Sequence, residues 1–253
     1  MRIILLSLFV NTCFIANAQL NTHPEATLYL AIQQGGGANG IAVAYNPLKK
    51  IYYCAIAGNA EFPLECFTGG ENIYRGAIGF DARGLWYNEK SKNLEGNSYG
   101  GDGIYAIALD KEGMPEGNPE NKYPNVQPDE QSVGAYDAAS DQIFYFDYTS
   151  GEVIPYKRTA GKKGKIIKLK NCPVPFENLN SAMVYTGQKN AEIGVYNFLD
   201  AEVYFFNKKG EYQTTVTLPD DAPYNEMFNF SYANGHVFLF DKDMREWIGY
   251  KVF

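Results

Sequence analysis

The sequence predicts an all-β fold built from a repeated unit of about four strands. The 253-residue chain carries 20 Tyr and 16 Phe, which pack well on a pleated surface, and 25 Gly and 12 Pro, which suit many turns. A hairpin pattern also recurs: an aromatic residue ends a strand, a few turn residues follow, and an apolar and aromatic run leads to Asp or Asn. Composition and repetition together therefore favour strands throughout the chain.

Residues 1–18 have the features of an export signal. Arg2 precedes an apolar run, and Ala16-Asn17-Ala18 places small residues before Gln19. We therefore expect cleavage after Ala18 and export to the periplasm or the extracellular space. Lipid attachment at Cys13 is a less favoured alternative, because the two residues before it are not those that usually precede a lipoprotein cysteine. The apolar run is shorter than the ~20 residues of a membrane span, so we expect none.

The remaining residues, 19–253, are expected to form a single domain, since all-β domains reach ~250 residues as one unit. The formal charge of the chain is −7, and it becomes −8 once Arg2 leaves with the signal, with 21 basic and 29 acidic residues remaining. Such a balance disfavours phosphate backbones and anionic lipid surfaces. We therefore expect no nucleic-acid partner.

The first strands can be read in order. Residues 26–32 form a strand candidate, and the glycine-rich stretch after it is a turn that lacks a phosphate-binding GxxxxGK[ST] pattern. Residues 40–58 then predict a hairpin that turns at Asn46-Pro47. This segment resembles the repeat of soluble β-propellers of the NHL and YVTN kind, in which Asp or Asn before Pro ends the inner strand and an aliphatic-Tyr pair follows. Asn46-Pro47 and Ile51-Tyr52 occupy those places. The resemblance implies a β-propeller and says little about activity.

Similar units follow along the chain and set the number of blades. Their anchoring aromatics are spaced by 35, 56, 60 and 36 residues, a mean of about 47, which suits a four-stranded blade. We predict five blades, with six as an alternative because the spacing is uneven. The last unit shows three strands before the chain ends, and residues 26–32 are expected to supply the fourth and close the ring. The anchors are Tyr45, Phe80, Tyr136, Tyr196 and Tyr232.

Two long segments rich in Gly, Pro and Asn, residues 89–101 and 111–131, are expected to be loops. Loops of this length in a compact domain often carry binding sites. Aromatic residues outside any strand pattern are the first candidates for ligand contacts, together with a strand-end acid and one of the two histidines of the chain. These candidate ligand-binding residues are Tyr99, Asp102, Tyr123, Tyr224 and His236.

Acidic residues recur at predicted strand ends, and two interpretations were weighed. A ring of carboxylates at the mouth of the central channel could hold calcium or act as the acid and base of glycoside cleavage. Alternatively, these side chains accept hydrogen bonds from turn amides, which we favour because the same turn position recurs in successive units. The residues concerned are Asp81, Asp102, Asp110, Asp137, Asp147 and Asp241.

Three cysteines remain after export. Cys54 and Cys66 are symmetric about residue 60, so they are expected to face each other across a hairpin, with a disulfide plausible in an oxidising compartment. Cross-strand geometry is awkward for a disulfide, so reduced neighbours are the alternative. Cys172 is expected to be a buried or turn-flanking thiol. The scarcity of histidine gives no support for a zinc site.

The segment Tyr156–Lys170 holds seven basic residues. It could bind an anion, but a solvated hairpin tip with lysines guarding an edge strand is favoured.

No catalytic motif accompanies these features. We therefore expect an exported, non-catalytic binding module that engages a protein or a glycan through the loop face near the central channel. The alternative is a carboxylate-dependent carbohydrate hydrolase or lyase. No cofactor is expected, although calcium is possible.

Overall fold

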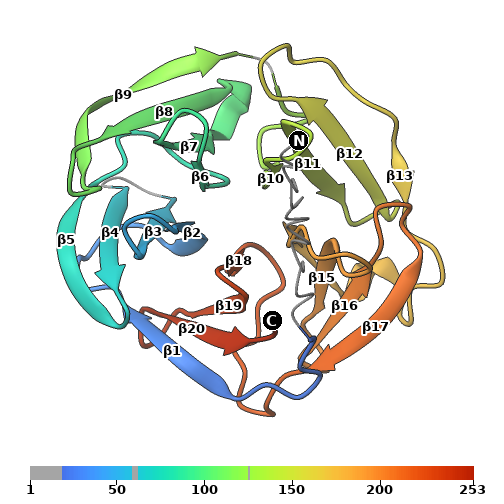
Figure 1. Cartoon of the computed structure of the whole chain (residues 1–253). Coiled ribbons are helices and arrows are strands. Elements are labelled where there is room, and N and C mark those ends of the chain that lie inside the picture. The colour runs from blue at the N-terminus through green and yellow to red at the C-terminus, as the bar shows by residue number, and fades with distance from the viewer. Residues whose placement is uncertain (1–18, 59–61, 125) are drawn as a thin grey trace, which may run out of the picture.

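The computed structural model describes residues 19–58, 62–124 and 126–253 (Figure 1). Within these ranges, twenty strands form five antiparallel four-stranded sheets that stand as blades around a central axis. Two short 3-10 helices, η1 (Tyr99–Gly101) and η2 (Phe176–Asn178), lie between strands. The protein is therefore a five-bladed β-propeller, which confirms the predicted fold class and blade number. The predicted export signal, residues 1–18, lies outside the described residues.

The first four blades each use four consecutive strands, with the first strand innermost. Blade 1 contains β2 (Asn39–Asn46), β3 (Ile51–Ala57), β4 (Pro63–Thr68) and β5 (Glu71–Ala77). Blade 2 contains β6 (Trp86–Asn88), β7 (Asn93–Asn97), β8 (Ile104–Leu109) and β9 (Pro115–Tyr123). Blade 3 contains β10 (Ala135–Asp137), β11 (Gln142–Asp147), β12 (Glu152–Lys157) and β13 (Ile167–Lys168). Blade 4 contains β14 (Leu179–Tyr185), β15 (Ile193–Asn197), β16 (Glu202–Phe206) and β17 (Tyr212–Thr217).

Blade 5 closes the ring as the sequence predicted. Its inner strands are β18 (Phe230–Ala233), β19 (His236–Asp241) and β20 (Glu246–Lys251), and its outermost strand is β1 (Ala26–Ala31). β1 runs antiparallel to β20, with Leu30 opposite Trp247, and the two strands lie side by side in Figure 1. The first strand of the ring thus completes the last blade, which ties the two ends of the chain together.

The true repeat is more regular than the aromatic anchors indicated. Successive innermost strands end 42, 49, 48 and 48 residues apart, at Asn46, Asn88, Asp137, Tyr185 and Ala233. Two anchors were not equivalent to the others, because Phe80 precedes β6 and Tyr196 belongs to β15, the second strand of its blade. The β15–β16 hairpin joins the second and third strands of its blade, but it has the same apolar strand and Asn turn as a hairpin between the first and second strands. The sequence alone therefore could not show which hairpin of the blade it is.

The two predicted long loops contain strands, so that prediction was wrong. β7 lies within residues 89–101, and Leu94 is its one aliphatic residue. β9 lies within residues 111–131 and is exposed along most of its length. An outermost strand needs no apolar alternation, and charged, proline-containing sequences are typical of such edges. The intervening segment forms β8, the third strand of blade 2.

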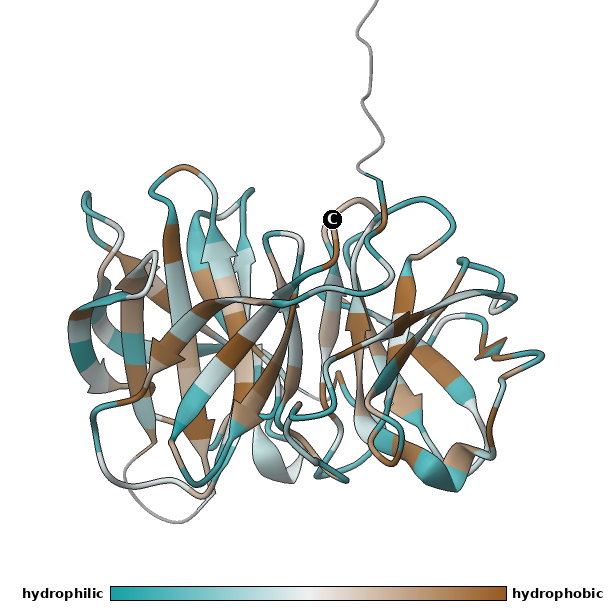
Figure 2. Ribbon diagram, turned by 90° about the horizontal axis from the view of Figure 1, so that it is seen from below, coloured by the Kyte–Doolittle hydropathy of each residue, from teal (hydrophilic) through white to brown (hydrophobic). Residues whose placement is uncertain are grey.

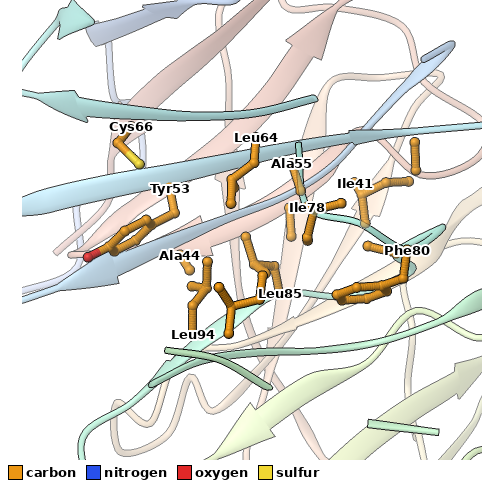
Figure 3. Close-up of a cluster of buried hydrophobic side chains, with 14 of the residues drawn as sticks. Ile41, Ala44, Tyr53, Ala55, Leu64, Cys66, Ile78, Phe80, Leu85 and Leu94 are labelled. Atoms are coloured by element: carbon orange, nitrogen blue, oxygen red, sulfur yellow. The ribbon is translucent and has the colours of Figure 1, made fainter. Parts of the chain in front are cut away.

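The core consists of layers between neighbouring blades. Figure 3 shows the layer between blades 1 and 2, where Tyr53 and Leu64 of blade 1 face Leu85 and Leu94 of blade 2. Each blade has two apolar faces, and each face is covered by the next blade around the ring. Close to the axis the backbones nearly touch: a Cβ on Gly84 would lie 2.5 Å from the carbonyl oxygen of Gly134.

The predicted pairing of Cys54 with Cys66 is wrong. The register places Cys66 opposite Tyr53 and Cys54 opposite Glu65, one residue away from the expected alignment. Because side chains alternate along a strand, this shift sends the two thiols to opposite faces of blade 1, and both are free. Part of the turn between them, residues 59–61, lies outside the described residues. Burial raises the pKa of both thiols. Cys172 is also free, and it is half-buried.

Ring closure predicts a large effect of a single side chain in β1. Leu30 is fully buried against blade 5, so Leu30→Ala should lower the free energy of unfolding by about 2–5 kcal/mol in chemical denaturation. Tyr29, its neighbour on the opposite face, is 49% exposed and serves as the matched control. An equal loss of stability in Tyr29→Ala would contradict closure through the buried face of β1.

Candidate binding face

The propeller has two faces with different kinds of loop. The crossover face carries the connections that run from the outermost strand of one blade to the innermost strand of the next, residues 32–38, 78–85, 124–134, 169–178 and 218–229. It also carries the turns between the second and third strands of each blade. The terminal face carries residues 19–25 and the C-terminus, which lies at the upper edge in Figure 2. The longer segments are thus gathered on the crossover face.

The axial cavity is small, and its lining residues carry no carboxylate, imidazole, ammonium or guanidinium group. Its volume is about 90 Å³, room for roughly three water molecules. All five innermost strands, or the residues beside them, line it, with Ile41, Trp86, Tyr136, Met183 and Phe230 among the contributors. Within the described part of the chain, no Asp, Glu, His, Lys or Arg side chain lines this cavity. The hydrolase or lyase hypothesis required converging carboxylates here, and it loses that support.

Four of the six strand-end acids accept hydrogen bonds from their own turns. Asp110 Oδ1 accepts the amide of Glu112 at 2.9 Å, and Asp147 Oδ1 accepts the amide of Thr149 at 2.9 Å. Asp241 makes the same contact with the residue two positions on. Asparagines at the equivalent positions behave alike: Asn46, Asn88, Asn197 and Asn207. The interpretation as turn-formers is confirmed for Asp110, Asp137, Asp147 and Asp241, whereas Asp81 instead binds Arg83.

Arg83 organises the centre of the crossover face. Its Nη1 and Nη2 donate to the two carboxylate oxygens of Asp81 at 2.6 and 3.2 Å, and its Nε donates to Gln131 Oε1 at 2.8 Å. The guanidinium carbon lies 4.8 Å from the ring centroid of Tyr99 and 5.5 Å from that of Phe228. A bidentate, stacked arginine is a rigid arrangement that lysine cannot reproduce. One buried side chain therefore holds together loops from blades on different sides of the axis.

Phe228 occupies an unusual backbone conformation beside this arginine. Phe228 and Asn229 have φ angles of 54° and 56°, a left-handed region that a bulky residue such as phenylalanine rarely adopts. Asn229 exchanges hydrogen bonds with Gly40, at 2.9 Å through its amide and 2.8 Å through Oδ1, and Asn180 Nδ2 donates to the Phe228 carbonyl at 2.8 Å. These contacts hold a strained segment in place, as is common at functional sites.

Phe228 also lines a hollow of about 330 Å³. Asn39, Tyr224, Glu226, Met227 and Lys242 also line it. The Tyr224 hydroxyl donates to Glu226 Oε1 at 2.8 Å. Tyr99, which packs against Arg83, makes a similar contact: its hydroxyl donates to Glu130 Oε2 at 3.1 Å. Both tyrosines are therefore held by carboxylates, and these hydrogen bonds raise the pKa of each phenol.

Exposed apolar side chains concentrate on this face. The described ranges contain ten exposed large apolar residues, of which six lie in the connections and turns of this face. The other four lie on the terminal face or on outermost strands. Two of the six, Tyr224 and Met227, line the hollow beside Phe228, and adjoining exposed apolar side chains mark an interaction surface more often than scattered single ones do. The six residues are Tyr99, Tyr148, Leu199, Tyr224, Met227 and Met244.

The five candidate ligand-binding residues do not form one cluster. Tyr99, Asp102 and Tyr224 lie in loops of the crossover face. Tyr123 ends β9, where its ring packs between blades 2 and 3 at 5.0 Å from the Arg158 guanidinium. His236 begins β19 at the terminal face, and burial lowers its pKa. The structure thus places three of the five residues on one face.

Sequence reasoning missed Arg83 and Phe228. Arg83 stands two residues after Asp81, which was itself noted, so a nearby opposite charge was the available signal. Phe228 gave no signal, because a phenylalanine is not expected at a left-handed φ. Its position depends on contacts with blade 1 and blade 4 that are remote in sequence.

Comparison of the sequence with protein-family models and with curated proteins finds no match. Solved structures do resemble the fold. A glutaminyl cyclase of Myxococcus xanthus has a TM-score of 0.59 at 11% identity, covering 93% of this chain and 100% of that one. A structural genomics protein of unknown function from Bacteroides thetaiotaomicron has a TM-score of 0.52 at 8% identity, covering 93% and 75%. At these identities the likeness shows the architecture alone, and it confirms the β-propeller resemblance.

Within residues 19–58, 62–124 and 126–253, no helix is long and apolar enough to cross a bilayer. No group of three or more His, Cys, Asp or Glu side chains is arranged there as a metal site.

Replacing Arg83 tests its role in holding the crossover face. Arg83→Lys keeps the charge but loses the bidentate contact and the stacking, so hydrogen exchange should accelerate at residues 98–103 and 126–134 and the melting temperature should fall. Arg75→Lys, on an exposed position of β5, is the control and should change neither. Unchanged exchange in Arg83→Lys would show that the loops are held by other contacts.

Acid should destabilise the protein through its turn carboxylates. Burial by itself raises the pKa of Asp137, Asp141 and Asp147, but hydrogen bonds from hydroxyl, guanidinium, ammonium and amide groups outweigh it and leave each pKa below its ordinary value of 3.8. Their stabilising contribution is therefore complete above that value and is lost as the pH falls through the lower folded pKa values. Urea denaturation across roughly pH 2–7 should show this loss of stability, and Asp147→Asn, which keeps a turn acceptor, should show a smaller one.

Proposed function

We propose that the protein is an exported, non-catalytic binding module that engages its partner through the crossover face. The single observation that carries the proposal is the number of exposed apolar residues on that face, two of which, Tyr224 and Met227, line the hollow beside Phe228. The export part of the proposal rests on the sequence pattern of residues 1–18. The partner is a protein or a glycan, as the sequence led us to expect.

A protein partner accounts for more of the surface than a glycan does. Met227, Met244 and Leu199 are aliphatic and exposed, and flexible methionines suit an apolar protein surface. A glycan would contact chiefly Tyr99 and Tyr224, whose hydroxyls donate to Glu130 and Glu226. The flat rings of these tyrosines would stack on sugar rings, and their hydroxyls would form hydrogen bonds with sugar hydroxyls. The rigid frame around Arg83 favours either partner, because a preorganised surface loses little entropy on binding.

The similarity to a glutaminyl cyclase does not extend the proposal to that activity. It rests on 11% identity and on the shared arrangement of blades. The proposed function is therefore argued from this chain's own surface.

A binding experiment with matched variants tests the proposal. Residues 19–253 would be immobilised and probed with an oligosaccharide array and with secreted proteins from the source cells, and a parallel thermal-shift screen would include calcium, which stays a possible ligand. The double variant Tyr224→Ala, Met227→Ala should weaken the captured interaction at least about thirtyfold, the scale of a hot spot. Leu48→Ala, 70% exposed on the terminal face, should leave it unchanged.

The outcomes separate the possible partners. A thermal shift from an oligosaccharide that the double variant abolishes identifies a glycan, and capture of a protein alone identifies a protein partner. Binding that survives in the double variant but is lost in Leu48→Ala would overturn the assignment to the crossover face.

A further inference from the structure

A second recess lies on the terminal side of the propeller, between blades 3 and 4. Its volume is about 250 Å³. The two blades stand side by side at the right of Figure 1, and residues of both line the recess. We call it the inter-blade pocket and define it by Asp137, Gln142, Phe144 and Lys165 of blade 3 with Tyr185 and Lys208 of blade 4. It is independent of the crossover face and of the function proposed for that face.

The charges of this pocket do not cancel. Lys208 reaches across from the turn after β16, and its Nζ lies 3.1 Å from Asp137 Oδ2 and 5.4 Å from the ring centroid of Tyr185. Lys165 is a second cation in the lining, and among the described residues it makes no hydrogen bond or ion pair with a side chain. Two lysines and one carboxylate leave a net charge of about +1, which suits a single anionic group.

Asp137 holds Lys208 in position and has little capacity for other work. It accepts hydrogen bonds from the Ala139 amide at 3.0 Å, the Ser140 hydroxyl at 2.7 Å and Lys208. Its side chain is almost wholly buried, whereas that of Lys208 is half exposed. Burial raises the pKa of the neighbouring Tyr185 to about 12, so its phenol stays protonated at neutral pH. The ammonium group is thus anchored on one side and open on the other.

The wall opposite these polar groups is apolar and aromatic. Phe144 and Ile193 are buried, and the Phe144 and Tyr185 ring centroids lie 5.0 Å apart at an angle of 38°. Pro155 is also buried along this wall. Gln142 adds a side-chain amide whose nitrogen donates no hydrogen bond within the described ranges. A mostly apolar recess with a few convergent polar groups is the usual form of a small-molecule site.

We propose that the inter-blade pocket binds a small organic carboxylate with an apolar body. The carboxylate would lie between Lys165 and Lys208, within reach of the Gln142 amide, and the body would rest on Phe144 and Tyr185. A singly charged carboxylate matches the net charge, whereas a phosphate dianion would leave one charge unpaired and present no apolar surface to the aromatic wall. The volume of the recess, about 250 Å³, is slightly below the range of about 300 to 1,000 Å³ that is usual for ligand sites, so the ligand is a single ring or a short branched chain.

Calorimetry with matched probes tests this proposal on residues 19–253. Benzoate and phenylacetate should bind, benzamide should bind about tenfold more weakly because it lacks the charge, and inorganic phosphate should not compete. Lys165→Gln should weaken benzoate binding by about tenfold, whereas Lys162→Gln, on the same exposed segment but outside the lining, should not.

The remaining outcomes are equally decisive. Lys208→Arg keeps a positive charge beside Asp137, so this variant should fold and should still bind benzoate measurably. Tyr224→Ala, on the crossover face, should bind benzoate as well as the unmodified protein does. Equal affinity for benzoate and benzamide, full binding by Lys165→Gln, or no heat from either carboxylate would overturn the proposal. Glucuronate binding in place of the aromatic acids would overturn the apolar-body assignment and point to an acidic sugar.

Discussion

The structure depends on a constraint that no single blade can satisfy, namely the burial of two apolar faces. A four-stranded sheet with large aromatic side chains on both sides is stable in water only when both are covered, and a closed ring covers every face. The pairing of β1 with β20 makes that closure, and it places Leu30 against Trp247 in the layer that blade 5 shares with blade 1. Every other layer is formed by neighbours in sequence. Hydrogen bonds between Ser231 and Val43 reinforce this closure at the inner strands of blades 5 and 1.

This architecture also determines where function can be located. The axis is filled by the innermost strands, whose backbones approach as closely as glycine allows, so only about 90 Å³ remains there. Asp110, Asp147 and Asp241, at strand ends, accept turn amides, and none of the strand-end carboxylates lines the axial cavity. The places that remain available for a site are the connections on the crossover face and the gaps between blades at the terminal face. Both proposed sites lie in these places.

Buried charges at the joints between elements are paired, in agreement with the cost of leaving them alone. Arg158 links blades 2 and 3 by contacting Glu95 and Asp141 at 3.2 and 2.7 Å, and Arg83 does the corresponding work among the connections of the crossover face. Glu65 is buried without a cation, and the amides of Gln33 and Gln34 satisfy its carboxylate. Apolar burial has little directional preference. These polar contacts are directional, and they therefore fix the relative positions of the elements that they join.

The sequence by itself determined the strand-rich class, the repeat, the blade number, the closing strand and the role of the Asx residues in turns. Each of these follows from local chemistry, since alternation and turn residues act over a few positions. The tertiary structure decided what the sequence could not. The register that separates Cys54 from Cys66 differs from the expected one by a single residue, and β9 is a strand because β8 offers it an edge. Tyr99 and Tyr224 lie on one face of the propeller and His236 lies on the other. The reason is that successive strands of a blade run in opposite directions, so that successive loops lie on alternate faces. Lys165 and Lys208 line one recess, and Arg83 lies against Phe228, only because blades are placed next to one another. That placement depends on burial across the whole ring.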